Sequence, residues 1–142
     1  MSARLSGLRV LVVEDEPDSR ELLGEFLTYE GAEVMTAEDA AHGMEALLRF
    51  KPSVLLSDIG MPGEDGHAFI RRCRQLQESE VGSIPAIAIT AFGRAEDRAK
   101  SLAAGFNDHL CKPIDLPVLV TRILQLTLRD ASEHQPENDS DS

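Results

Sequence analysis

The sequence predicts an α/β fold in which a doubly wound sheet of five parallel strands is flanked by five helices. Three observations lead to this prediction. Several runs with strand character are almost continuously aliphatic, as expected for strands that are buried on both faces. These runs alternate with segments whose apolar residues recur at helical spacing. Gly, Pro and capping residues separate the two kinds of segment, so a strand is followed by a helix five times over.

The first half of the chain contains two of these units and a third strand. The aliphatic run LRVLVV stops at an acidic turn, and Pro17 behind it suits the first position of a helix because it has no amide hydrogen to satisfy. Asp39 is a candidate N-cap for the second helix, and the pair Lys51-Pro52 ends that helix. The run SVLLS then forms the third strand.

The second half continues the same pattern. The third helix begins near Gly66, and IPAIAIT forms a fourth buried strand. The fourth helix is poor in large apolar residues and ends at Gly105, whereas Asp115 caps a strongly apolar last helix. The predicted strands are residues 8–13, 33–36, 53–57, 84–90 and 107–111, and the predicted helices are residues 17–29, 39–51, 66–77, 95–104 and 115–128.

Right-handed crossovers between five strands favour the flavodoxin-like strand order 2-1-3-4-5 as the leading option. We expect residues 1–6 to lead into a single domain over residues 7–128. Residues 129–142, RDASEHQPENDSDS, lack periodicity and are mostly polar or acidic, which is typical of a disordered tail. The chain shows no helix-turn-helix and no basic recognition helix, so we expect no attached DNA-binding output domain.

Composition excludes several classes of function. A net charge of −11 and an aromatic content of 4% argue against nucleic-acid binding, which needs clustered cations and stacking platforms. Cys73 and Cys111 lack metal-site spacing and are too few for a disulfide scaffold. The sequence has neither a signal peptide nor an apolar run of about 18 residues. We therefore expect a cytoplasmic protein that binds neither membranes nor nucleic acid.

Polar residues that suit phosphoryl chemistry follow four of the predicted strands. Carboxyl ends of parallel strands meet at one edge of the sheet, where ligands of such folds bind. Carboxylates without His or Cys favour a hard cation such as Mg²⁺, a lysine suits a phosphoryl group, and an aspartate can be a nucleophile. Each residue alone has a simpler interpretation as a cap, a strand former or a surface charge, but their joint placement favours a site. They are Glu14, Asp15, Asp58, Thr90 and Lys112.

The segments VLVVEDEPDSRELL, VLLSDIGMPGEDG, IPAIAITA and AGFNDHLCKP carry a specific resemblance to a known family. Over about residues 7–128 the chain resembles a CheY-like receiver domain of two-component response regulators. The resemblance also implies the strand order 2-1-3-4-5. The segments LSGLRVLVVEDEPDSRELL and AGFNDHLCKPID are similar to receivers fused to hybrid sensor histidine kinases, and both an excised domain of that kind and a single-domain regulator remain open.

The resemblance assigns roles to the residues at the strand ends. It implies that Asp58 accepts a phosphoryl group from a phosphohistidine on a sensor histidine kinase or a phosphotransfer protein. Mg²⁺ would be held by Asp15 directly, by Glu14 through water, by Asp58, and by the backbone carbonyl of Gly60. The protein would transfer no other group, so we expect no enzymatic activity beyond self-phosphorylation and slow autodephosphorylation.

The resemblance also implies a switch on the far side of the site. Lys112 would pair with Asp58 and then with the phosphoryl oxygens, from a cis Lys112-Pro113 bond. The Thr90 hydroxyl would move onto the phosphoryl group. A downstream protein would then bind the face formed by the fourth helix, the fifth strand and the fifth helix.

Three positions depart from the family pattern or tune it. His109 stands where the family usually has Tyr or Phe, and an imidazole can titrate near neutral pH as well as rotate. We expect His109 to report the movement of Thr90. Gly60 and Phe92 flank the path of hydrolytic water in this family, and neither has a side chain that orients water. We therefore predict slow autodephosphorylation.

Two alternatives from other classes are weaker. A pseudo-receiver would bind partners without phosphorylation, but the chain retains all of the site residues that phosphorylation requires. A phosphatase of the haloacid dehalogenase type would use an aspartate nucleophile with a second Asp two residues later, where this chain has Gly60.

Overall fold

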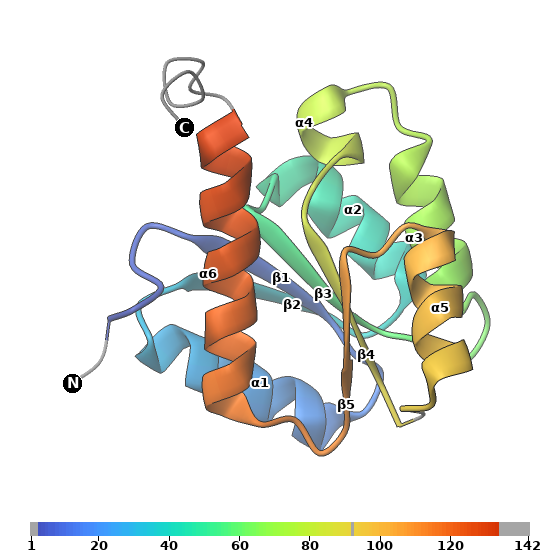
Figure 1. Ribbon diagram of the computed structural model, residues 1–142, viewed down its shortest axis with the longest axis horizontal. Helices are drawn as coiled ribbons and strands as arrows, with labels where there is room; N and C mark the ends of the chain where they lie inside the picture. The colour runs from blue at the N-terminus through green and yellow to red at the C-terminus, as the bar shows by residue number, and fades with distance from the viewer. Residues whose placement is uncertain (1–2, 92, 134–142) are drawn as a thin grey trace.

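The computed structural model, which describes residues 3–91 and 93–133, has five parallel strands in the order β2-β1-β3-β4-β5 (Figure 1). This arrangement confirms the predicted doubly wound sheet and its order. All four pairs of neighbouring strands are parallel. The strands are β1 (Arg9–Val13), β2 (Glu33–Ala37), β3 (Val54–Asp58), β4 (Ala86–Thr90) and β5 (Asp108–Cys111).

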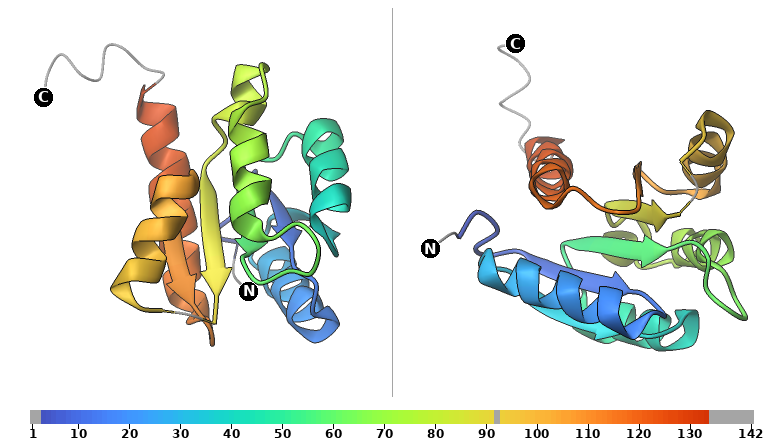
Figure 2. Two further views of the ribbon diagram at one scale, coloured as in Figure 1. Left: turned by 90° about the vertical axis from the view of Figure 1, so that its right-hand side faces the viewer. Right: turned by 90° about the horizontal axis from the view of Figure 1, so that it is seen from below.

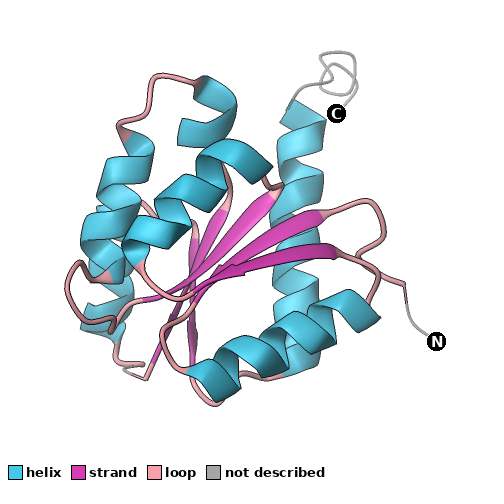
Figure 3. Ribbon diagram, turned by 180° about the vertical axis from the view of Figure 1, so that it is seen from behind, coloured by secondary structure: helices cyan, strands magenta, loops and turns pink. Residues whose placement is uncertain are grey.

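Helices cover both faces of this sheet (Figure 3). Their bounds match the predicted ones closely except after the third helix and at the end of the last. The helices are α1 (Pro17–Tyr29), α2 (Ala40–Phe50), α3 (Gly66–Arg74), α4 (Ser79–Gly82), α5 (Ala95–Ala104) and α6 (Leu116–Glu133). Among the described residues, no helix is both long enough and apolar enough to cross a membrane.

The prediction that the third helix runs to residue 77 was wrong. The helix ends at Arg74, and the short helix α4 follows it. Arg74 explains the early end, because its Nη1 donates to the carbonyl oxygens of Gly82 at 2.9 Å and Ile84 at 2.7 Å. These bonds fold the chain back toward β4. Such contacts join residues that local periodicity does not relate.

The last helix is longer than predicted, because α6 continues through Glu133. The prediction of a disordered tail from residue 129 was therefore wrong for residues 129–133. The reason is local, since Arg, Ala and Glu in this stretch are good helix formers even without an apolar pattern. Residues 134–142 lie outside the described residues, so the rest of the tail stays a prediction.

The two faces of the sheet have separate cores, with α1 and α6 on one face and α2, α3 and α5 on the other (Figure 2). Side chains of β1 alternate between them: Val10 and Val12 pack toward α1 and α6, and Leu11 and Val13 toward α2 and α3. Strands β3 and β4 are buried along their whole length. The central strands are therefore a rigid base for the residues at their carboxyl ends.

Candidate functional site

The five residues singled out at the strand ends lie at one edge of the sheet. Asp58 is the last residue of β3 and Thr90 the last of β4, while Glu14 and Lys112 directly follow β1 and β5. The strand register brings these ends level, because Val13 is opposite Ser57, Asp58 opposite Ile89, and Thr90 opposite Cys111. The fold thus gathers four sequence segments in one place.

The acidic residues form a compact cluster. Glu14, Asp15 and Asp58 each present a carboxylate oxygen, and these oxygens lie within 4.8 Å of one another. Glu14 and Asp58 are buried, with 1% and 6% of their surface exposed, whereas Asp15 is half-buried. The cluster is therefore open to solvent on the Asp15 side, where a hydrated cation can enter.

Lys112 closes the other side of the cluster. Its Nζ lies 3.1 Å from Oε1 of Glu14 and 3.5 Å from Oδ2 of Asp58. The cis bond between Lys112 and Pro113, which the resemblance implied, is present. One ammonium group thus faces two buried carboxylates, and it partly neutralises them.

Charge in this cluster is unbalanced without a further cation. Burial of Glu14, together with the neighbouring Asp58, raises the pKa of the Glu14 carboxyl to about 7. Burial lowers the pKa of Lys112, but hydrogen bonding to Glu14 and the charges of Glu14 and Asp58 outweigh it, so the net pKa of Lys112 is raised. The shift of Lys112 reflects the negative charge of the two carboxylates, whereas the shift of Glu14 reflects chiefly its burial and, to a smaller extent, the neighbouring Asp58.

The donor set fits a hard divalent cation. The Oε1 atom of Glu14 is fully buried, and it faces the Lys112 ammonium at 3.1 Å. All side-chain ligands in the cluster are carboxylate oxygens. Mg²⁺ prefers a few carboxylates and completes its octahedron with water and phosphate oxygens. The cluster of Glu14, Asp15 and Asp58 therefore fits a hard divalent cation.

Backbone contacts fix the acidic turn. The amide of Glu16 donates to Oε2 of Glu14 at 3.1 Å, and Nη1 of Arg20 donates to the carbonyl oxygens of Glu14 at 2.9 Å and Asp15 at 3.4 Å. Arg20 is not predicted from the sequence, because a cation five residues after the acidic pair usually indicates only an exposed helix face.

The loop after β3 is held by glycines. The amide of Gly60 donates to Oδ1 of Asp58 at 3.3 Å, which fixes one oxygen of that carboxylate. A Cβ atom at Gly66 would collide with the carbonyl oxygen of Asp58, so only glycine lets α3 begin this close to β3. At Gly60, by contrast, a Cβ atom would meet no described atom within 4 Å. The side of the site near Gly60 is therefore open.

The predicted switch residues are both buried. Thr90 has 2% and His109 has 7% of its surface exposed. The Nδ1 atom of His109 lies 2.9 Å from Oγ of Ser101 on α5, and Nε2 of His67 on α3 lies 3.2 Å from the same oxygen. Ser101 and His67 are not predicted from the sequence, because nothing local relates a serine on one helix to histidines on another helix and a strand. Phe92 lies outside the described residues.

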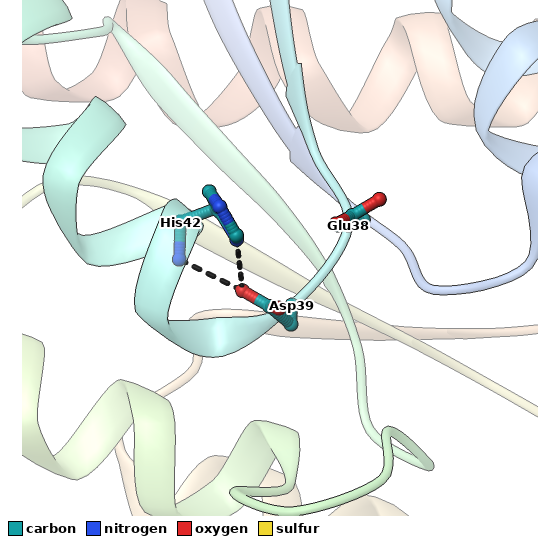
Figure 4. Close-up of side chains that lie close together, drawn as sticks. All are labelled: Glu38, Asp39 and His42. Atoms are coloured by element: carbon teal, nitrogen blue, oxygen red, sulfur yellow. Dashed lines mark hydrogen bonds and ion pairs between the residues drawn. The ribbon is translucent and has the colours of Figure 1, made fainter.

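A second group of potential metal ligands has a structural explanation. Glu38, Asp39 and His42 also bring ligand atoms within 4.8 Å of one another, but Glu38 and His42 are exposed and Asp39 is only half-buried. Figure 4 marks two interactions, both between His42 and Oδ1 of Asp39. The backbone amide of His42 donates to that oxygen at 2.8 Å, so Asp39 is the N-cap of α2, as predicted.

An apolar groove leads away from the candidate metal cluster. It has a volume of about 450 Å³ and runs between α1 and the segment that follows β5. Glu14 and Lys112 of the site are among its lining residues. The remaining lining is mostly apolar and consists of Ser19, Leu22, Leu23, Pro113, Ile114 and Leu116. A partner that reaches the carboxylates can therefore bury apolar surface beside them.

Similarity to known proteins agrees with this arrangement. An uncharacterised 14.6 kDa protein of Leptolyngbya boryana is 45% identical over 121 residues, which are 85% of this chain and 90% of that protein. The transcriptional regulatory protein TcrA of Mycobacterium tuberculosis is 36% identical over 94% of this chain. The chain spans only about half, 51%, of the length of TcrA.

Solved structures show the same fold. The signal receiver domain of a signal transduction histidine kinase from Syntrophus aciditrophicus is 27% identical, with a TM-score of 0.76 over 85% of this chain and 90% of that one. The response regulator receiver domain family matches residues 10–124, which include Glu14, Asp15, Asp58, Thr90 and Lys112. The chain therefore belongs to the family of receiver domains of two-component response regulators.

Proposed function

We propose that Asp58 accepts a phosphoryl group from a phosphohistidine of a sensor histidine kinase or a phosphotransfer protein. One observation carries the proposal: Asp58 lies at the end of a buried strand with two more carboxylates within 4.8 Å and the Lys112 ammonium at 3.5 Å. That set combines a nucleophile, ligands for a divalent cation, and a fixed positive charge.

The transfer is an in-line displacement at phosphorus. A carboxylate oxygen of Asp58 forms the new P–O bond while the P–N bond to the partner's histidine breaks. The leaving imidazole keeps the electron pair and takes a proton from solvent. The chain contributes position and charge rather than acid–base chemistry, as in other phosphoryl transfers.

Each neighbour of Asp58 has a task in this step. Gly60 N–H holds Oδ1 of Asp58, which leaves Oδ2, on the side of Lys112, as the attacking atom. Glu14 and Asp15 would hold Mg²⁺, which supplies positive charge to the transferring phosphoryl oxygens. Lys112 is placed to exchange its contact with Asp58 for one with the new phosphoryl group.

The proposed output is a change in the α5–β5–α6 face. The phosphoryl group adds a charge of about −1.5 to −2 and new acceptor oxygens. The Thr90 hydroxyl, at the end of β4, and Lys112 can respond to it. His109 would report that response to the surface, where a downstream protein binds. Apart from its own phosphorylation and dephosphorylation, the domain would catalyse no reaction.

Dephosphorylation should be slow. Gly60 has open space and no side chain to orient a water molecule. A lifetime of seconds for the phosphoryl group in the isolated domain with Mg²⁺ would contradict this part of the proposal.

The proposal is tested by incubating the protein with Mg²⁺ and acetyl phosphate and measuring the intact mass. We expect one phosphoryl adduct in the parent chain and in Asp18→Asn, an exposed control on α1. We expect none in Asp58→Asn, and none without Mg²⁺. An adduct that persists in Asp58→Asn would overturn the assignment, and its absence from the parent chain would favour a pseudo-receiver.

A further inference from the structure

Arg20 stands out among the residues around the acidic cluster, because it is a cation beside a candidate cation site. It lies on α1, and its Nη1 atom points at the backbone of the acidic turn rather than at a carboxylate. Its bond to the carbonyl oxygen of Glu14, at 2.9 Å, is the shorter of the two, and the bond to Asp15 is 3.4 Å. The guanidinium thus spans the two residues whose side chains face the cluster.

The other contacts of this turn involve its amides, and Arg20 binds its carbonyl oxygens. The amide of Glu14 donates to the carbonyl oxygen of Ala37 on β2 at 3.0 Å, and the amide of Glu16 binds the Glu14 side chain. Both contacts fix amides. Arg20 holds the carbonyl oxygens of Glu14 and Asp15. These oxygens determine how the peptide planes, and therefore the carboxylates, are oriented.

We propose that Arg20 is a positioning residue for the divalent cation, which it assists through the backbone of Glu14 and Asp15. This inference rests on the proposed function, since that function supplies the Mg²⁺ site. Residues that orient metal ligands typically change metal affinity by about 10–100-fold when they are replaced.

The charge of Arg20 and its proposed positioning role have opposite effects on the affinity for Mg²⁺. A positive charge near a Mg²⁺ site repels the ion, so removal of the charge alone predicts tighter binding. Loss of positioning predicts weaker binding. Arg20→Met removes both the charge and the hydrogen bonds, so the direction of the change in affinity decides between the two.

The experiment measures Mg²⁺ binding by calorimetry in the full chain, with thermal unfolding as a check on folding. We expect the dissociation constant to rise about tenfold in Arg20→Met. Arg20→Lys keeps the charge without the planar fork, and we expect it to bind more weakly than the parent chain too. Arg49→Met is the matched control, because Arg49 has a side chain 78% exposed and only a 3.5 Å surface pair with Glu45. We expect its affinity to stay within about twofold.

A second readout needs no metal. Hydrogen exchange of residues 14–16 in metal-free Arg20→Met should be faster than in the parent chain. Unchanged exchange together with equal or tighter Mg²⁺ binding would overturn the inference and leave the proposed function intact. A parent chain that does not bind Mg²⁺ would instead contradict the proposed function, and the exchange measurement would still test whether Arg20 orders the turn.

A second inference rests on a different observation, which is how helix α5 is held against the rest of the domain. Ser101 and Ala104 are the buried residues of α5, and the N-cap position, Arg94, makes no side-chain capping bond within the described residues. The carboxyl end of the helix is pinned, since Nε of Arg74 donates to the carbonyl oxygen of Gly105 at 2.9 Å. The middle is held through the Ser101 hydroxyl, which lies between two imidazoles.

Both imidazoles are attached to parts of the molecule that adjoin the phosphorylation site. His67 follows Gly66, whose Cα packs directly on the backbone of Asp58. His109 lies on β5, paired with Ala88 on the strand that ends at Thr90. The Ser101 hydroxyl therefore touches one residue from the loop side of the site and one from the Thr90 side.

We infer that His67, Ser101 and His109 form a latch that holds the middle of α5 against α3 and β5. Opening of this latch lets α5 pivot about its pinned carboxyl end and alters the α5–β5–α6 face. The proposed function enters only in naming this face as the output, because the latch itself is a property of the unphosphorylated domain.

Ser101→Ala tests the latch, because the latch and helix propensity predict opposite changes in the rate of hydrogen exchange in α5. Alanine is the better helix former, so propensity alone predicts slower hydrogen exchange in α5. Loss of the hydroxyl removes the contacts of α5 with one buried and one half-buried imidazole, so the latch predicts exchange about tenfold faster over residues 95–104. Lys100→Ala, at the neighbouring exposed position, is the matched control and should leave exchange within about twofold.

His67→Leu removes only part of the latch. It deletes the 3.2 Å contact between His67 and Ser101 and keeps the 2.9 Å contact between Ser101 and His109. We expect an increase in exchange smaller than that of Ser101→Ala. Exchange in α5 that is unchanged or slower in Ser101→Ala would overturn the latch. Since the measurement uses no phosphodonor, it stands whether or not Asp58 is phosphorylated.

Discussion

Helices α3 and α5 lie side by side on the same face of the sheet, but different forces hold them (Figure 1). Helix α3 buries Phe69, Ile70 and Cys73, and the carboxylate of Asp65 caps its first turn. Helix α5 buries only a serine and an alanine, and its start has no side-chain cap among the described residues.

The difference indicates which of the two helices can move. Full burial of one large apolar side chain stabilises a fold by roughly 1.5–3 kcal/mol, so α3 is anchored by several kcal/mol that α5 does not have. Polar contacts hold α5 instead, and these can be exchanged for others at little net cost. Helix α3 is therefore a fixed reference for the site, and α5 is suited to respond to it.

The largest expected effect comes from truncating a buried apolar side chain of α3. Phe69 is fully buried, and Phe69→Ala should lower the free energy of unfolding by about 3–5 kcal/mol. Leu102→Ala removes a large apolar side chain from α5, but Leu102 is 40% exposed, so its cost should stay below about 1 kcal/mol. Chemical denaturation followed by circular dichroism measures both. Equal losses from the two variants would remove the contrast between the helices.

A second contrast sets the apolar packing of α3 against Glu14, a buried acid of the candidate metal cluster. Because the pKa of Glu14 is raised to about 7, folded protein keeps its proton where unfolded protein, with a pKa near 4.5, has lost it. Stability from this group is therefore full below about pH 4.5 and falls as the pH rises to 7, by about 3 kcal/mol in metal-free protein.

Urea unfolding between pH 4.5 and 8 measures this fall. In Glu14→Gln the dependence that Glu14 contributes should vanish, and in the parent chain added Mg²⁺ should restore stability at pH 7–8. A metal-free parent chain that is more stable at pH 7 than Glu14→Gln would contradict the pKa assignment.

Arg74 connects α3 to the end of α5, and its replacement tests this connection. Its side chain donates to carbonyl oxygens of Gly105, Gly82 and Ile84, and Arg74→Met would leave these partners without their donor. We expect a loss of about 2–3 kcal/mol in the free energy of unfolding, measured by thermal or chemical denaturation. Arg71→Met, an exposed position in the last turn of α3, should cost less than about 0.5 kcal/mol. A loss in Arg74→Met as small as that would mean that the hydrogen bonds of Arg74 do not stabilise the fold.

The smallest expected effect comes from giving α5 the cap that α3 has. Arg94→Ser places a hydroxyl at the N-cap position, which should stabilise the helix by about 0.5–1 kcal/mol. The two surface ion pairs of Arg94, at 3.8 and 3.7 Å, contribute little and offset only part of this gain. Hydrogen exchange in α5 should slow, opposite in sign to Ser101→Ala. Faster exchange would show that Arg94 itself holds the start of α5.

The sequence alone predicts the sheet, its strand order and the convergence of the site residues well. Local chemistry carries these features: Pro17 and Asp39 begin helices where expected, and Asp58 and Lys112 follow strands whose carboxyl ends must meet. The order of the strands needed the family resemblance as well, because periodicity describes elements one at a time.

Apart from the extension of α6, the features that the sequence did not predict depend on contacts across the fold. The early end of α3 depends on Arg74, whose side chain binds carbonyl oxygens 10 and 31 residues away in the sequence. The contacts of Arg20 with the acidic turn and of Ser101 with two histidines likewise join elements, and each involves a residue that is unremarkable in its own segment. Such contacts become visible only when the segments are placed together.

The open space around Gly60 has a consequence for how this domain can be altered. Because a Cβ atom there would meet no described atom within 4 Å, larger residues can be introduced without disturbing the packing that holds Asp58. Under the proposed function, the lifetime of the phosphoryl group would therefore depend on a position that does not contribute to the packing of the fold. Substitution of this one residue, by engineering or by natural variation, would change that lifetime and leave the fold as it is.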